Sequence, residues 1–436
     1  MEWLSVDVFQ FFEQWSIDTD SLIFHGFSMQ NTTLTPAPGT QASLPRNECI
    51  CPICKSTESV DVFEVRRLPV HVGIFGTTRD EARSLPTGDI ILSYCPRCEF
   101  VHNRVFDSDS IAYRPGYEVA LHHSPTFRNF MEGVAARLMD RFSLHDKRVL
   151  EIGCGCAYFL RMLADLGDND CIGYDPTVAT EGIEHVGHGT VELVRDYFGA
   201  HHEADADFIC CLSVFEHIAS PVEFLTTLRS QIGERAPGIY FEVFNAFQAI
   251  SQQESWSIHY EQVNYFSQHS LAYAFEQSGF RILESNTCYE GEQYVFVDAV
   301  PALQTQASDH RDDRPEVQIP IEITAFADHH RRRMELWSNR FDEYRANGHR
   351  VVVWGSGGKG ISFLNTLPSH DVIRYVVEIN PDKHGKFIPG SAQEIVPPEF
   401  LAEYQPDVII ITNALYEPEM RQQARELGVE CEFLIA

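Results

Sequence analysis

The chain has 436 residues, of which 44% are hydrophobic and 12% aromatic, and its formal net charge is −30. The length predicts roughly two to four domains, and the hydrophobic content excludes a chain that is disordered over most of its length. The 63 acidic side chains outnumber the 33 basic ones. The resulting negative charge repels nucleic acid and anionic membranes, so we expect neither as a partner. The sequence contains no apolar run of about 18 residues and it starts with an acidic segment. We therefore expect a cytoplasmic protein without a membrane span or a secretion signal.

Residues 1–46 are expected to form a flexible N-terminal extension. Their second half is rich in Thr, Pro, Ser and Gly, a composition typical of loops and linkers. Their first half carries many aromatic side chains, which favour a helix that docks on a neighbouring part of the chain or on a second subunit.

Two Cys-x-x-Cys motifs follow, and together they predict a structural zinc site. Each motif forms a tight knuckle that directs two sulfurs to one point, and two knuckles complete a tetrahedral shell of thiolates. In a chain without a secretion signal such pairs favour metal over disulfides, and buried or redox-active thiols are the alternative. Forty residues separate the knuckles, enough for a small β-lobe over residues 47–110, and Cys49 is a possible substitute ligand. The predicted ligands are Cys51, Cys54, Cys95 and Cys98.

From residue 148 the pattern changes to buried strands that alternate with helices, as in a doubly wound parallel α/β sheet. The strand RVLEIGCG ends in a glycine turn that contains Glu151, Gly153 and Gly155. Tyr158 stands where a dinucleotide fingerprint has its third glycine, which argues against NAD.

This glycine turn resembles that of class I S-adenosylmethionine methyltransferases, which implies such a domain over residues 111–300. In that family an acid at the end of the next strand accepts the ribose hydroxyls, and Asp175 occupies this place. The resemblance also places Asp196 where the family often recognises adenine. His217 lies in the loop after the fourth strand, where a catalytic role and a packing role are equally consistent with the sequence.

The order of parts resembles the three-domain sugar C-methyltransferases, over residues 47–436. The motifs that carry this resemblance are CPIC, CPRC, EIGCG, SWSIHYEQVNYFS, VVVWGSGGKG and INPDKHGKFIPG. These enzymes methylate nucleotide-linked keto-deoxysugars in antibiotic and polysaccharide pathways. The resemblance therefore implies methylation of a carbon next to a ketone through an enolate, with S-adenosylmethionine as the cofactor.

In this family the acid/base cluster lies in a Tyr-His-Glu-His run, and the matching run here is His259, Tyr260, Glu261 and Gln262. The glutamate is kept, but Gln262 cannot titrate as the family's second histidine does. His259 or Glu261 is therefore the predicted base, and Tyr260 is a candidate donor to the enolate oxygen. The alternative is that the run forms only a packed turn.

The segment YRPGYEVALHHSP lies where the family has a tyrosine that faces the substrate. We select Tyr117 for this role from a set that also contains Tyr113, His122 and His123. An aromatic cover over the cofactor is the alternative role.

A linker is expected over residues 301–322, followed by a smaller Rossmann-like α/β domain over residues 323–436. Its turn contains Gly355, Gly357 and Gly360, and Glu378 follows 18 residues later, as in a dinucleotide fingerprint. Three interpretations remain open: a domain that helps to hold the nucleotide-sugar, glycines with a purely structural role, and a working NAD site.

Positive side chains in so acidic a protein are candidates for binding an anionic substrate. Lys359, at the start of the helix after the turn, is expected near the diphosphate. Lys383, His384 and Lys386 form a basic cluster, for which a solvated loop is the alternative. The candidate substrate-binding residues are Gly355, Gly357, Lys359, Lys383 and Lys386.

Two other functions remain open at this stage. The altered catalytic run is also compatible with an O- or N-methyltransferase that acts on another small metabolite. A scaffold that binds the cofactor without transferring methyl is the non-enzymatic alternative, against which the intact glycine turn argues. A homo-oligomer is compatible with the sequence.

Overall fold

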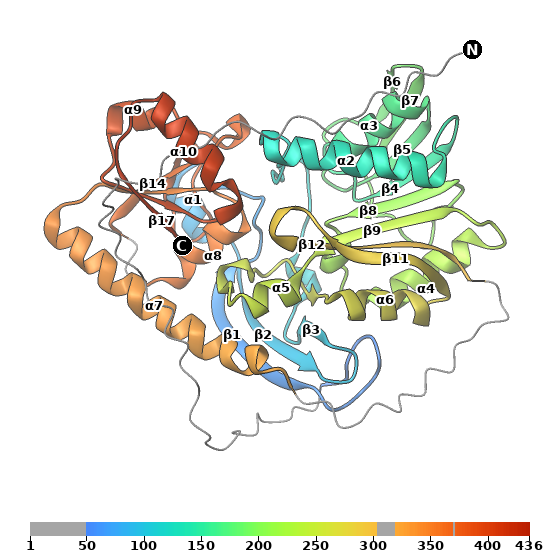
Figure 1. Cartoon of the computed structure of the whole chain (residues 1–436), viewed down its shortest axis with the longest axis horizontal. Coiled ribbons are helices and arrows are strands. Elements are labelled where there is room, and N and C mark those ends of the chain that lie inside the picture. The colour runs from blue at the N-terminus through green and yellow to red at the C-terminus, as the bar shows by residue number, and fades with distance from the viewer. Residues whose placement is uncertain (1–48, 303–318, 369–370) are drawn as a thin grey trace, which may run out of the picture. The chain divides into compact units, whose positions relative to one another are not determined.

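The computed structural model describes residues 49–302, 319–368 and 371–436, which contain three β-sheets (Figure 1). The whole of the predicted N-terminal extension, residues 1–46, and most of the predicted linker lie outside the described residues. Within the described part of the chain, no helix combines the length and the apolar character needed to cross a membrane.

The N-terminal sheet is antiparallel and has the strand order β1-β2-β3-β10. Three of its strands come from the cysteine-bearing lobe, whereas β10 follows the predicted catalytic run: Asn264 pairs with His102 and Tyr265 with Val101. This pairing joins the lobe to the segment that follows Glu261. The elements are β1 (Val60–Pro69), α1 (Arg79–Ser84), β2 (Thr87–Cys95), β3 (Phe100–Asn103) and β10 (Asn264–Tyr265).

The central sheet has eight strands in the order β11-β12-β9-β8-β4-β5-β7-β6. Its core β7-β5-β4-β8-β9 is parallel, while β12 is antiparallel to both β9 and β11, and β6 forms an antiparallel edge. This arrangement confirms the expected class I methyltransferase sheet. The strands are β4 (Arg148–Ile152), β5 (Asp170–Tyr174), β6 (Gly182–Val186), β7 (Gly189–Val194), β8 (Phe208–Leu212), β9 (Gly238–Phe244), β11 (Phe280–Cys288) and β12 (Tyr294–Pro301).

Helices cover both faces of the central sheet because successive strand residues point to opposite sides. On β4, Val149 packs in the cluster formed with α2 and α3, and Leu150 packs in the cluster formed with α4 and α6. Figure 1 shows these two pairs of helices on either side of the strands. The helices are α2 (Pro125–Phe142), α3 (Tyr158–Gly167), α4 (Pro221–Ile232), α5 (Ala246–Ser251) and α6 (Gln268–Gln277).

The C-terminal sheet has five parallel strands in the order β15-β14-β13-β16-β17, which confirms a Rossmann-like fold. Val353 of β13 packs on the side of α7 and α8, and Trp354 packs with residues of α9 and α10. The elements are α7 (Ile321–Asn347), β13 (Val351–Trp354), α8 (Gly358–Thr366), β14 (Ile373–Val377), β15 (Glu394–Val396), α9 (Phe400–Tyr404), β16 (Val408–Ile411), α10 (Glu417–Glu426) and β17 (Glu432–Ile435).

In both parallel sheets the first strand lies at the centre, where the strand order reverses. Ligands of doubly wound folds bind in the crevice at this point, outside the carboxyl ends of the strands. The two glycine turns that the sequence singles out follow β4 and β13, so each lies at such a point.

Candidate functional site

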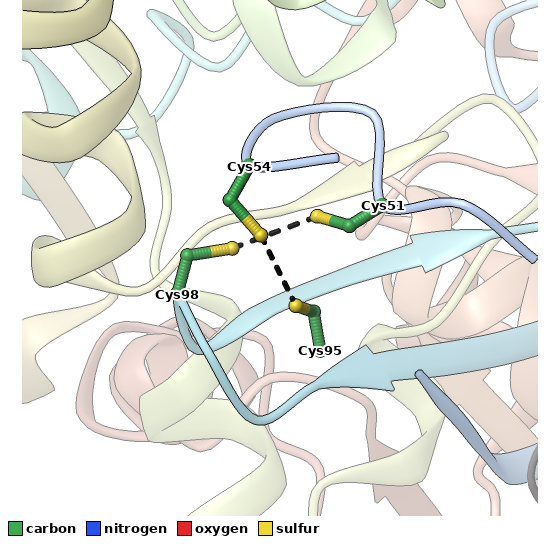
Figure 2. A group of neighbouring side chains, drawn as sticks. All are labelled: Cys51, Cys54, Cys95 and Cys98. Carbon is green, nitrogen blue, oxygen red and sulfur yellow. Dashed lines mark hydrogen bonds between the residues drawn. The ribbon is translucent and has the colours of Figure 1, made fainter. Parts of the chain in front are cut away.

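The four predicted metal ligands converge at the turn between β2 and β3 (Figure 2). Their sulfur atoms all lie within 4.8 Å of one another, with Cys51 Sγ 3.6 Å from Cys98 Sγ and Cys54 Sγ 3.5 Å from Cys95 Sγ. A tetrahedral site with zinc–sulfur bonds of about 2.3 Å has sulfur–sulfur edges of about 3.8 Å, so these four residues fit a zinc ion. Cys49 lies outside the group, with its sulfur 3.3 Å from His102 Nε2.

The first glycine turn is shaped by its two glycines, whose φ angles of +76° and +52° are costly for other residues. A Cβ on Gly153 would lie 2.4 Å from Val214 Cγ2, so the turn also needs glycine for close contact with the loop after β8. A Cβ on Gly155 would meet no described atom within 4 Å, so this glycine borders open space at the carboxyl edge.

Two carboxylates lie at this turn. Asp175 accepts hydrogen bonds from the Gly155 amide at 2.9 Å and from the Thr177 amide at 2.7 Å. Glu151 is 4% exposed, and its Oε2 atom has no hydrogen-bond partner among the described residues. Burial, together with the charge of Asp175, raises the pKa of Glu151 well above its usual value. The Leu160 amide contacts this carboxyl group, but its Oε2 atom is left without a partner among the described residues beside an open turn, which fits a cationic ligand such as S-adenosylmethionine.

Asp196, the candidate for adenine recognition, lies in the loop after β7. Its Oδ2 atom is 3.1 Å from His201 Nε2 and 3.6 Å from His202 Nε2. The Gly199 amide donates to His202 Nδ1 at 3.3 Å, so neutral His202 carries its proton on Nε2 and directs it towards Asp196. These contacts make a polar group around Asp196 and leave this carboxylate partly exposed.

Glu261 lies at the centre of the predicted catalytic run and is fully buried. Its Oε2 atom accepts a hydrogen bond from the Tyr117 hydroxyl at 2.6 Å, so the structure brings together two of the predicted catalytic residues. Its Oε1 atom lies 2.7 Å from Nδ1 of His71, a residue that sequence reasoning missed. His71 follows β1 and is 190 positions away in the chain, and no motif or spacing marks it.

His217 is anchored next to this carboxylate. Its Nδ1 atom lies 2.8 Å from the backbone carbonyl of Glu261. Because a carbonyl only accepts, Nδ1 must carry a proton, and neutral His217 has its lone pair on Nε2. Nε2 has no hydrogen-bond partner in the described part of the chain, which makes it available to a ligand.

His259, the other predicted base, lies in a different environment from Glu261. Burial lowers its pKa to about 4, with a further contribution from His217, so the ring is neutral and weakly basic near neutral pH. Its Nδ1 atom is buried without a hydrogen-bond partner among the residues described. A Cβ on Gly358 would lie 3.1 Å from the His259 ring, so the second glycine turn packs directly against this histidine.

Tyr260, the candidate donor to the enolate oxygen, belongs to the hydrophobic cluster of the N-terminal lobe. Its ring fills the space beside Gly88, where a Cβ would come within 2.2 Å of Tyr260 Cε2. Its hydroxyl accepts a hydrogen bond from the Asp107 amide at 2.9 Å. Tyr260 therefore packs into the N-terminal lobe, whereas the next residue of the run, Glu261, contacts Tyr117 and His71. Gln262 is also buried, and its Oε1 atom has no partner within the described ranges.

The tyrosines of the segment before α2 form one wall of the site. Tyr113 and Tyr117 meet edge to face with ring centroids 5.1 Å apart, and Tyr113 also faces His71 and His217. Burial and the charge of Glu261 raise the pKa of both phenols well above the usual value, so both stay protonated. The Tyr113 hydroxyl has no hydrogen-bond partner among the described residues.

The neighbouring histidines of this segment lie elsewhere: His122 stacks on the Tyr158 ring, with centroids 4.8 Å apart, and on the His123 ring.

In the second glycine turn, the acid that a dinucleotide fingerprint places at the ribose is Glu378, and it is held by groups of the turn and the loop after β14. Glu378 accepts hydrogen bonds from the Ser356 hydroxyl and amide within the turn itself and from the Asn380 amide. Burial alone would raise the pKa of Glu378, but the charge of Lys383 and these hydrogen bonds hold it below its usual value. A Cβ on Gly355 would lie 2.6 Å from Thr412 Oγ1, which gives this glycine a structural reason. Gly357 is exposed, and a Cβ at this position would meet no described atom within 4 Å.

The candidate lysines are distributed differently from the expected basic cluster. Lys383 is 4% exposed, pairs with Glu378 at 3.6 Å and lies over the Phe75 ring. Lys359 Nζ donates to Glu254 Oε2 at 2.7 Å, in the segment just before the catalytic run. Lys386 is half-buried.

Comparisons with known proteins add the following. Residues 127–285 match the family described as methyltransferase domain, and residues 310–435 match the family described as C-methyltransferase C-terminal domain. The C-methyltransferase NovU of Streptomyces niveus is 24% identical over 398 residues, which cover 86% of this chain and 92% of NovU.

Magnesium protoporphyrin IX methyltransferase from Synechocystis, with bound SAH, is 16% identical, with a TM-score of 0.33, over 42% of this chain and 89% of that one. A SAM-dependent methyltransferase from Aquifex aeolicus is 15% identical, with a TM-score of 0.32, over 42% and 95% of the two chains. The chain is thus an S-adenosylmethionine-dependent methyltransferase that carries a C-methyltransferase C-terminal domain.

Proposed function

We propose that the protein methylates the carbon next to a ketone in a nucleotide-activated keto-deoxysugar or a similar anionic keto compound. The observation that carries this proposal is the group formed by Glu261, Tyr117, Tyr113 and His217, which combines a buried carboxylate, two protonated phenols and a free imidazole nitrogen. Carbon methylation needs such acid/base groups because the carbon must first lose a proton. The C-methyltransferase C-terminal domain supports the same choice.

In this proposal His217 takes the proton from the carbon next to the ketone. Its Nδ1–H is held by the Glu261 carbonyl, which leaves the Nε2 lone pair for this task. Glu261 is less suitable because both of its oxygens already accept hydrogen bonds, and His259 is less suitable because its pKa of about 4 makes it a weak base.

The enolate that forms carries negative charge on its oxygen. Tyr113 is the donor we assign to this oxygen, because its hydroxyl is protonated and has no partner among the described residues. Tyr117 is bonded to Glu261 and shapes the wall beside it. Bound S-adenosylmethionine supplies an activated methyl group on a sulfonium centre. We assign its binding to Glu151, Gly153, Gly155 and Asp175, with Asp196 at the adenine end.

We also infer that Cys51, Cys54, Cys95 and Cys98 bind one structural zinc ion. Four thiolate ligands leave no open coordination position, so the ion would hold the lobe together and take no part in methyl transfer. The geometry of the sulfurs and their burial support this assignment.

The test is a methyl-transfer assay with S-adenosylmethionine and a panel of nucleotide-linked keto-deoxysugars. We expect a product with a new carbon–methyl bond, identified by mass spectrometry and NMR. In D₂O, without the cofactor, we expect the proton next to the ketone to exchange with solvent deuterium. A methyl group on oxygen or nitrogen, with no exchange in any keto-sugar, would contradict the proposal.

A variant separates the base from the other groups. His217→Asn should keep cofactor affinity in calorimetry but slow both exchange and methyl transfer, by on the order of 10²-fold or more. His145→Asn, on an exposed histidine remote from this group in the sequence, is the matched control. Exchange at the wild-type rate in His217→Asn would show that another group is the base.

A further inference from the structure

The Glu261 carboxylate is held from two sides by donors on different segments. Tyr117 donates to Oε2 at 2.6 Å, and His71 approaches Oε1 at 2.7 Å. Glu261 is 0% exposed and His71 is 8% exposed, so water does not replace either contact easily. A buried carboxylate that lost a donor would keep an uncompensated charge, which makes each contact consequential.

The proton on His71 is placed by a third group. The Ala112 amide donates to His71 Nε2 at 3.3 Å, so Nε2 acts as an acceptor and neutral His71 carries its proton on Nδ1. This is the tautomer that donates to Glu261. Ala112 immediately precedes Tyr113, so one short segment sets the tautomer of His71 and also supplies both phenols of the site.

We propose that His71 is a positioning residue of the active site: its Nδ1–H fixes the Glu261 carboxylate and, through it, the Tyr117 hydroxyl and the Glu261 carbonyl that anchors His217. The proposal rests on the function proposed above. It gives the N-terminal lobe a role in the reaction, since His71 follows β1, the strand that begins shortly after the first cysteine knuckle. The lobe carries the histidine to the site in addition to packing beside it.

The test uses two amide side chains that differ in where they place a donor. In His71→Asn the amide nitrogen lies near the former Nδ1 position, whereas in His71→Gln it lies nearer to Nε2. We expect His71→Gln to lower kcat about 10-fold to 100-fold with unchanged cofactor affinity, as for other groups that orient a catalytic side chain. His71→Asn should recover most of the rate. Equal rates in the two variants, or a kcat of His71→Gln within about twofold of wild type, would overturn the proposal.

A double-mutant cycle with Glu261→Gln tests the contact itself. If His71 acts through Glu261, His71→Gln should add little to the kinetic defect of Glu261→Gln, and independent, multiplying effects would contradict the proposal. The same cycle on the free energy of unfolding in urea requires no substrate. If the free energies of unfolding show no coupling between the two substitutions, the His71 contact is overturned. If they show coupling but the wild-type protein methylates no keto compound, the proposed function is contradicted instead.

Discussion

At the scale of single residues, burial sets the ionisation of three glutamates at the carboxyl edge of the central sheet. Glu151 lies near the end of β4, Glu216 follows β8, and Glu242 lies in β9, and all three are at most 4% exposed. Burial raises the pKa of each of them, to about 7 for Glu242. Hydrogen bonds from Tyr240 and Cys288 partly offset the effect at Glu242, whereas Glu151 Oε2 has no such partner among the described residues. Glu216 Oε2 is also unpartnered among the described residues, but Glu151 lies at the open glycine turn, so it is the carboxyl group whose charge a bound cation can change most.

This difference predicts proton release when the cofactor binds. A positive charge next to Glu151 stabilises its carboxylate, so its raised pKa should fall and a proton should leave the protein. Calorimetry of S-adenosylmethionine binding at neutral pH, in buffers of different ionisation enthalpy, should detect release of up to about one proton. Glu151→Gln should abolish this release and weaken binding. If the wild type releases no proton, Glu151 is already ionised or does not contact the ligand.

Asp175 permits a separate prediction at the same scale. Its carboxylate joins the Gly155 amide to Thr177, so Asp175→Ala removes the ribose contact that we assign to it and also a link across the glycine turn. Cofactor affinity should fall at least about 10-fold in calorimetry, since hydrogen bonds to charged groups contribute roughly 1.5–3 kcal/mol. Asp205→Ala, on a partly exposed acid that pairs with Arg148 and Arg235, is the control. Unchanged affinity in Asp175→Ala would refute the ribose role.

At the scale of elements, the sequence predicts what depends on local pattern. The strands β4, β8 and β13 are short apolar runs that end in glycine or in a polar loop, and both parallel sheets follow from such runs alternating with helices. The contacts between distant segments could not be predicted in this way. His71 meets Glu261 only because β10 pairs with β3, and Tyr260 turns away only because Gly88 leaves room for its ring. Neither condition has a local signature at the residues concerned.

The second glycine turn illustrates the same limit. Its spacing is that of a dinucleotide fingerprint, and the acid of that fingerprint, Glu378, contacts Ser356 and Lys383. The turn instead packs against the catalytic run, with Gly358 on His259 and Ser362 donating to the Ile258 carbonyl at 2.7 Å. Close packing thus explains Gly355, Gly358 and Gly360 but not the exposed Gly357, and the spacing alone cannot distinguish this cause from ligand binding.

The two cysteine knuckles allow a prediction for the N-terminal lobe. Cys51, Cys95 and Cys98 are 0% exposed and belong to the same hydrophobic cluster as one face of the central sheet. Metal analysis should find about one zinc per chain, and Cys95→Ser should remove it and lower Tm by on the order of 10 °C. Cys431→Ser, on a half-buried cysteine of the C-terminal part, should keep the zinc. A wild-type protein that is stably folded and contains no zinc would exclude the metal site.

At the scale of the whole molecule, few basic side chains at the candidate site offset the net charge of −30. Lys359 and Lys383, which the sequence offers to an anionic substrate, are paired with Glu254 and Glu378. These pairs also tie the second glycine turn to the segment before the catalytic run and hold the loop after β14. Attraction of an anionic substrate by these lysines would therefore compete with contacts that organise the structure.

Two buried histidines predict how the stability of the molecule depends on pH. Burial lowers the pKa of His259 and of His330 from 6.5 to about 4. Below about pH 6.5 the unfolded chain binds protons at these residues that the folded chain does not yet bind. The free energy of unfolding should therefore fall as the pH decreases from about 7 to about 4, and the loss should level off below the folded pKa.

His330 allows this contribution to be isolated. Its Nδ1 atom lies 2.7 Å from Ser255 Oγ, a contact that His330→Asn can keep in part without a group that titrates. Urea unfolding of both proteins is measured at several pH values. The difference between the two free energies of unfolding cancels the contribution of the many carboxylates, because the variant shares them with the wild type. Relative to His330→Asn, the wild type should lose on the order of 2–3 kcal/mol of stability between about pH 7 and about pH 4. Parallel stability curves for the two proteins would mean that His330 takes up its proton equally well in the folded and the unfolded chain, and that its burial does not hold it neutral.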